Sequence, residues 1–342
     1  MTILVNAYST LVSKVELTFD HDLIGQRDRS DADLVDHLHG FMGYVLDGGN
    51  REMSASLYAV LQHIQRVQNH YTFEIEEDAL EALSAWGWKS NSIFFLPDSN
   101  VRDPAGAVLV DSKTGEPAEE AQIPFPADAR QRKLQSEFNL RNRGIDTPEL
   151  LPPIISEQEV VLRNADDVAW RALALFILAV RAESLASQRP IPIDQLRSKS
   201  PMAFKAFTDV ELAFMNSESP DQRQVVEMAW RYECLNVLQW ALGFHEELKF
   251  ADEICDVPLV AQTMVDRDDR QIINMARLRP ASQILDAADQ NQRLLWAARQ
   301  ARLEETDPPA ALDGGVLVER QHAFNWLIRF QDAGWDDVDT PS

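Results

Sequence analysis

The chain has 342 residues, of which 45% are hydrophobic, and it carries a net charge of −23. This length and apolar content allow one large domain or two ordinary ones, and they argue against wholesale disorder. The negative charge disfavours nucleic acids and anionic membrane surfaces as partners, since both are bound through basic protein surfaces.

The N-terminal part mixes short strands with helices. Alternating or β-branched residues predict strands at residues 3–9, 15–19, 71–76, 92–97 and 107–111. Helical periodicity predicts helices at residues 31–49, 54–69 and 78–88. Residues 98–128 are rich in Pro, Asp, Glu, Ala and Gly, which is typical of a surface loop or linker. We therefore predict a small, acidic α+β domain over residues 1–128, with 8 basic and 21 acidic side chains.

After residue 128 the pattern becomes helical almost throughout. Helices are predicted at about residues 129–143, 157–186, 208–216, 221–243, 268–277, 281–303 and 316–332. Ser156 with Glu159, and Thr208 with Glu211, have the spacing of capping boxes at two of the helix starts. The predicted fold class is α+β: a small N-terminal mixed α/β domain followed by a mainly α-helical C-terminal domain over residues 129–342.

The compartment is predicted from what the sequence lacks. The longest apolar run, Ala172–Val180, is too short to span a bilayer, which needs about 20 residues. The first ten residues show no basic leader, and two cysteines cannot form a disulfide framework. We therefore expect a cytoplasmic protein with no membrane association.

Common catalytic and metal-binding motifs are not found in the sequence. There is no glycine-rich phosphate loop, no dinucleotide fingerprint and no nucleophile elbow. The stretch His245–Lys249 has lysine where a zinc protease helix needs its second histidine. His37 and His39 would point away from one another on a helix. We predict no metal site and no cofactor.

Tryptophan and charged residues recur together on the predicted C-terminal helices. Helical spacing places Glu233 and Arg231 on or beside the apolar face of one helix, and Glu319 and Arg320 on or beside that of another. The candidate polar cluster comprises Arg171, Arg231, Glu233, Arg293, Glu319 and Arg320. The candidate aromatic frame around it comprises Trp230, Trp296, Trp326 and Trp335.

Two interpretations of this cluster stay open at the level of sequence. In the structural interpretation, Arg–Glu pairs fix how the helices dock, with good pairing offsetting the cost of desolvation. In the functional interpretation, Arg231 or Arg320 binds an anion in a cleft, and a glutamate acts as a base. The accessibility of these charges to solvent would distinguish the two.

A family resemblance rests on a series of stretches in the helical part. These are WRALAL, the capping box at 208–211, WRYECLNVLQWALGF, ILDAADQNQRLLWAAR, VLVERQHAFNWL and GWDDVDT. In this order they resemble the bacterial family called domain of unknown function 4272, over about residues 130–340. The resemblance implies a helical domain and a bacterial cytoplasmic setting, and it assigns no catalytic residue. Residues 1–128 lie outside it.

The sequence favours a non-catalytic interaction protein that binds a basic protein partner, as an immunity protein or an adaptor would. The acidic charge would attract such a partner. The alternative is a metal-independent hydrolase or transferase, or a small-anion-binding protein, that uses the Arg/Glu cluster of the helical domain.

Overall fold

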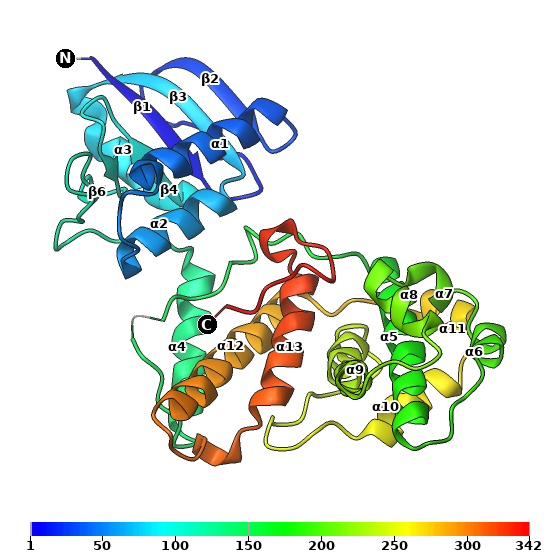
Figure 1. The fold of residues 1–342 in the computed structure, drawn as a ribbon. Helices are drawn as coiled ribbons and strands as arrows, with labels where there is room; N and C mark the ends of the chain where they lie inside the picture. Colours follow the sequence, from blue (N-terminus) through cyan, green and yellow to red (C-terminus); the bar gives the residue numbers. More distant parts are fainter. Residues whose placement is uncertain (1, 150, 342) are drawn as a thin grey trace. The chain divides into compact units, whose positions relative to one another are not determined.

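The computed structural model describes residues 2–149 and 151–341 (Figure 1). The chain divides into two compact units. Unit 1 contains the residues up to Arg130 together with Ile155–Val160, and unit 2 contains Gln131–Ile154 and the residues from Val161 onward. The division falls within helix α4 (Ala127–Arg141). Unit 1 combines a sheet with helices and unit 2 is built from helices, so the predicted α+β class is confirmed.

Unit 1 is built on a six-stranded sheet in the order β2-β3-β1-β4-β5-β6. Every neighbouring pair of strands is antiparallel. In chain order the strands are β1 (Thr2–Ser9), β2 (Asp22–Asp28), β3 (Asn69–Glu76), β4 (Ser92–Phe95), β5 (Val101–Arg102) and β6 (Val108–Val110). Strand β2 therefore lies at one edge of the sheet and is bonded to β3 alone.

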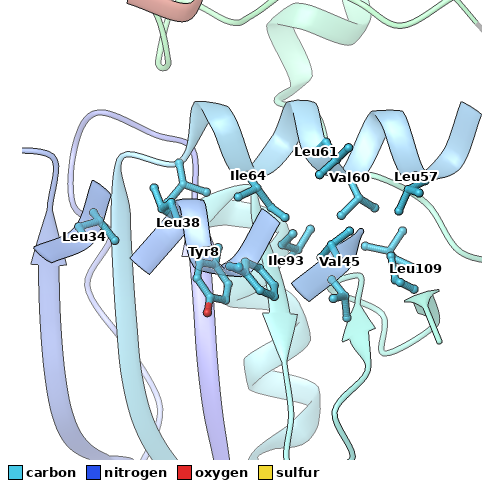
Figure 2. Packing of buried hydrophobic residues seen from close by; sticks show 14 residues of the cluster. Tyr8, Leu34, Leu38, Val45, Leu57, Val60, Leu61, Ile64, Ile93 and Leu109 are labelled. Atoms are coloured by element: carbon cyan, nitrogen blue, oxygen red, sulfur yellow. The ribbon is translucent and has the colours of Figure 1, made fainter. Parts of the chain in front are cut away.

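Apolar side chains cover both faces of this sheet. Helices α1 (Ala32–Val45) and α2 (Ala55–Arg66) contribute to one core, in which Ile64 of α2 faces Ile93 of β4 and Leu57 faces Leu109 (Figure 2). Helix α3 (Leu80–Ser90) contributes to a second core, in which Trp86 packs near Phe73. The short helices η1 (Asp47–Gly49) and η2 (Glu77–Ala79) complete unit 1. The two cores follow from the alternation of side chains along each strand.

The prediction of a strand at residues 15–19 is wrong. Its alternation is real, because Val15, Leu17 and Phe19 pack against the second core. Their backbone, however, bonds to side chains: the Val15 N–H donates to the Tyr71 hydroxyl, and the Trp86 indole N–H donates to the Glu16 carbonyl. The strand forms instead at β2, whose largely exposed, glycine-containing sequence lacks the alternation of a half-buried strand.

Two further differences concern segments predicted as loop and as helix. Within residues 98–128 the structure contains β5, which was not predicted, as well as β6. The helix predicted from residue 157 begins at Ala165 as α5 (Ala165–Ala186), capped by Asn164. The Ser156 N–H does donate to the Glu159 carboxylate, but Gln158 pairs with Val12 through its carbonyl oxygen. This tertiary contact within unit 1 holds the segment as a turn.

Unit 2 surrounds the long helix α5, whose residues 171–179 are all buried. The predicted helices near 208–216, 221–243, 268–277, 281–303 and 316–332 correspond to α8 (Asp209–Asn216), α9 (Gln222–Ala241), α11 (Asp269–Met275), α12 (Ala281–Leu303) and α13 (Gly314–Leu327). Not predicted were α6 (Ile193–Lys199), α7 (Ala203–Ala206) and α10 (Val257–Val265). Short helices η3 (Pro309–Ala311) and η4 (Phe330–Asp332) precede and follow α13, which ends earlier than predicted because Arg329 is left-handed.

Candidate functional site

The inward charges of unit 2 meet where α9 and α13 pack against each other. The carboxylate of Asp221 accepts the Gln224 N–H at 2.8 Å and caps α9. The carboxylate of Asp313 accepts the Gly315 N–H at 2.8 Å and caps α13. Gly315 also allows close packing, because a Cβ there would lie 3.0 Å from the ring of Trp230. The helix starts and this contact thus set how the two helices face each other.

Two ion pairs cross between these helices. Arg231 on α9 lies 2.8 Å from the Glu319 carboxylate on α13, and both side chains are about one-fifth exposed. Arg320 on α13 lies 3.3 Å from the Glu233 carboxylate on α9, and both are buried. Arg320 also donates to the Lys249 carbonyl at 2.7 Å, and Glu233 also accepts the Cys255 N–H. Each charge therefore has a partner of opposite sign and, in the buried pair, a second hydrogen bond.

Both cysteines of the chain lie beside these carboxylates. The Cys234 sulfur is 3.1 Å from the Glu319 carboxylate oxygen, to which the thiol donates. Burial raises the pKa of Cys234, and the charge of Glu319 raises it further. Burial and the charge of Glu233 likewise raise the pKa of Cys255. Both side chains therefore stay as thiols, which are poor nucleophiles and poor metal ligands.

Arg171 lies in a neighbouring polar corner. Its guanidinium is 2.5 Å from the Glu211 carboxylate and stacks 5.0 Å from the centre of the Trp335 ring. His322 packs edge-on against the same ring, with the two centroids 4.6 Å apart. Burial, together with the charges of Arg231 and Arg171, lowers the pKa of His322 to about 4. His322 is therefore neutral and lies close to two of the ion pairs.

Arg293 belongs to a separate network on α12. It pairs with Asp289 one turn earlier at 2.9 Å and reaches Glu137 of α4 at 3.4 Å. It also donates to the Pro152 carbonyl at 3.2 Å. Arg293 and Asp289 are both buried. Of the six predicted cluster residues, the structure brings four together at α9 and α13, places Arg171 in the adjacent corner, and gives Arg293 other partners.

The four tryptophans divide into two pairs. Trp326 and Trp335 contact each other edge-on, with centroids 5.3 Å apart, and line the corner with Arg171. Trp230 and Trp296 pack against a core cluster that contains Leu294. The four tryptophans therefore do not form the predicted single frame around the ion pairs.

Several members of these networks were missed or given less weight in the sequence. Glu211 was recognised only as a capping residue, although it both caps α8 and pairs with Arg171. No pattern in the sequence indicated that Glu137 or Cys234 would contact the charged residues of these networks. Glu137 reaches Arg293 from another helix 156 positions away, a proximity that helical spacing cannot reveal.

The paired charges have little remaining capacity to bind an anion or to act in catalysis. An arginine bonded to a carboxylate has reduced capacity for an incoming anion, and a glutamate bonded to arginine is a weak base. Within the described residues, no group of three or more His, Cys, Asp or Glu side chains is placed to hold a metal ion. None of the helices described is both long and apolar enough to cross a membrane.

Comparison with known proteins identifies the helical part. Neither a curated protein nor a solved structure matches the chain. Residues 132–338, more than half of the chain, match the family described as Domain of unknown function (DUF4272). The stretches that carried the resemblance form α5, α9, α12, α13 and the tail after α13. The chain therefore belongs to the DUF4272 family.

Proposed function

We propose that the protein is a non-catalytic interaction protein of the bacterial cytoplasm that binds a basic protein partner, in an immunity or adaptor role. The observation that carries this proposal is the open edge of the sheet in unit 1. There β2 exposes Leu23 and Ile24 to solvent, with exposed fractions of 51% and 60%. Edge strands that expose apolar side chains are recurrent sites of strand addition by a partner.

Carboxylates surround this edge. Asp22 of β2 pairs in register with Glu74 of β3, so two negative charges lie opposite each other on neighbouring strands. The group that we call the acidic edge comprises Asp20, Asp22, Glu74, Glu77, Asp78 and Glu81. In the part of the chain that the structure describes, none of these six takes part in an ion pair. A lysine- or arginine-rich segment would relieve this repulsion and cover the apolar side chains.

The ion pairs of unit 2 strengthen the electrostatic argument. Arg171, Arg231 and Arg320 are each matched by a carboxylate, so their networks add no net charge. The excess of 23 negative charges is therefore carried outside these pairs. The same pairing disfavours the alternative of a hydrolase, transferase or anion-binding protein acting through the Arg/Glu cluster.

The test is capture of basic proteins by the full chain from a native bacterial lysate, at low and at high salt. The edge variant carries Asp22→Asn, Glu74→Gln and Asp78→Asn. The matched control carries Glu227→Gln, Glu253→Gln and Asp307→Asn, three exposed residues of unit 2, and changes the net charge by the same amount. We expect the wild type and the control to retain the same basic protein at low salt, and the edge variant to lose it.

High salt should release that protein from the wild type and from the control, because screening weakens contacts between exposed charges. Equal retention by the edge variant and the control would overturn the assignment to β2. A wild-type chain that retains no basic protein at low salt would overturn the proposed function itself.

A further inference from the structure

A second polar cluster lies on the sheet of unit 1, on the face toward α1. The Tyr8 hydroxyl of β1 is 3.0 Å from Nε2 of His37 on α1. The rings of His37 and His70, the latter from β3, have centroids 4.8 Å apart. Arg27 of β2 lies 3.2 Å from Nδ1 of His70. Four elements far apart in the sequence thus bring one guanidinium, two imidazoles and one phenol together.

The hydrogen bonds of this cluster determine where its protons lie. Nε2 of His70 is 3.2 Å from the side-chain oxygen of Asn6, which also accepts from the Thr72 hydroxyl at 3.0 Å. His70 therefore carries its proton on Nε2 and accepts from Arg27 on Nδ1. Burial raises the pKa of Tyr8, so its hydroxyl keeps its proton and donates to Nε2 of His37. His37 is then protonated on Nδ1, an N–H for which the described residues supply no partner.

Arg27 is the charged group of the cluster, and the nearest acidic side chain in strand register, Glu74, lies four positions from His70 on the same face of β3. Burial, followed by the influence of His37 and Arg27, lowers the pKa of His70 to about 3. Burial and then Arg27 lower the pKa of His37. Within the described residues, Arg27 takes part in no ion pair, although the chain has 55 acidic and 32 basic side chains. In unit 2, by contrast, Arg231 and Arg320 at the α9–α13 interface each form an ion pair with a carboxylate. Arg171, which stacks on Trp335, does so as well.

Solutes can reach this cluster. Arg27, His37, Asn6 and Thr72 are all half-buried, so each retains contact with solvent, while His70 behind them is buried. The donors without a partner are the remaining N–H groups of Arg27, Nδ1 of His37 and the amide nitrogen of Asn6. They come from three different elements, and within the described residues none of the ion pairs involves them.

We propose that Arg27, His37 and Asn6, supported by His70 and Tyr8, form a binding site for a phosphate group. A guanidinium presents two parallel N–H donors that match two oxygens of a phosphate. The imidazole and amide donors then face its remaining oxygens, which a planar carboxylate lacks. The site shares β2 and β3 with the acidic edge but uses none of its six carboxylates, and it does not depend on the proposed protein partner.

The test is an NMR titration of the full chain, with its seven histidines labelled at Cε1, against inorganic phosphate in a phosphate-free buffer. We expect saturable shifts of the His37 and His70 signals, assigned through His37→Gln and His70→Asn. Arg27→Gln should weaken binding about tenfold or more, because it removes charge-assisted hydrogen bonds. Arg27→Lys keeps the charge but loses the paired donors, and should bind with intermediate affinity.

The matched control is His39→Gln, an exposed histidine two positions along the same helix, which should bind phosphate as the wild type does. Acetate at equal concentration and ionic strength should leave both signals unshifted. Three results would each overturn the proposal: no saturable shift with phosphate, equal affinity in Arg27→Gln, or equal shifts with acetate. Because unchanged spectra of other residues report folding of each variant, loss of binding is distinguished from loss of structure.

Discussion

Arginines in the two units have opposite surroundings. In unit 2, Arg320 is buried against Glu233, and Arg231 faces Glu319 on the same pair of helices. In unit 1, Arg27 is half-buried beside two neutral histidines and has no carboxylate within ion-pair distance in the described chain. A buried charge needs a partner within the protein, whereas a half-exposed charge can use solvent or a ligand. This difference supports a structural role for Arg320 and agrees with the binding role that we propose for Arg27.

The largest expected effect separates these two arginines by stability. Arg320→Gln leaves the buried Glu233 carboxylate without its counter-charge and should lower the free energy of unfolding by about 3–5 kcal/mol. Arg27→Gln loses one hydrogen bond at a solvent-accessible position and should cost about 1 kcal/mol. Urea unfolding of both variants measures the difference. Similar losses for the two substitutions would contradict the contrast between the units.

A double substitution sharpens the interpretation of the buried pair. Adding Glu233→Gln to Arg320→Gln removes the uncompensated carboxylate, and should recover roughly 1–3 kcal/mol of the loss. The double-mutant cycle needs both single variants and the wild type, measured by the same urea unfolding. Additive losses in the cycle would show that the two side chains do not act as a pair.

Neutral buried histidines occur in both units, and they predict a loss of stability in acid. Burial, together with the charge of Arg66, lowers the pKa of His63 to about 3. The unfolded chain takes up protons below about pH 6.5, while the folded chain does not, so stability is full above that pH and declines toward pH 3. At pH 5.5 each such histidine should have lowered the free energy of unfolding by about 1.4 kcal/mol.

This pH dependence is measured by comparing the wild type with His63→Asn between pH 7.5 and 5.5. The free energy of unfolding of the variant should fall less steeply as the pH is lowered. Near pH 5.5 the difference in slope between the two chains should approach the value for one proton bound on unfolding. His39→Gln, an exposed site, should retain the wild-type slope. A His63→Asn chain with an unchanged slope would show that His63 can be protonated in the folded protein.

The smallest expected effect concerns a helix cap that supports the Arg171 pair. Thr208 accepts the Glu211 N–H at 3.2 Å, and Glu211 holds both the cap and Arg171. Thr208→Ala should lower the free energy of unfolding by about 1 kcal/mol. Ser219→Ala, at an exposed position, should change it by less than about 0.5 kcal/mol. Thermal unfolding that gives the same change for both would show that the cap contributes nothing.

Local signals in the sequence were sufficient for most helices and for the inward direction of the charges. Thr208 and Glu211 form the predicted capping box, and Arg320 and Glu233 are buried on the apolar sides of their helices. Local signals were insufficient where a distant part of the chain supplied the hydrogen-bond partner of the backbone. The alternating residues 15–19 bond to Tyr71 and Trp86, and Gln158 bonds to Val12.

The candidate sites show the same division. Helical spacing placed Glu233, Glu319 and Arg320 on the inward sides of their helices, because the face that a residue occupies depends on the residues three or four positions away. The same spacing rule excluded His37 and His39 as ligands of one metal ion. It gives no information on the distance between His37 and His70, which lie on different elements. That contact requires a helix to lie over a particular pair of strands.

By itself, the sequence determined the family, the α+β class, the acidic charge and the inward face of each long helix. These properties depend on composition and on short-range periodicity, which any segment carries within itself. Only the tertiary structure decided which arginines are paired with a carboxylate of the protein and which remain available to solvent or to a ligand. Arg231 and Arg27 are equally basic as residues, and their different roles depend on whether a carboxylate or an imidazole from a distant element lies beside them.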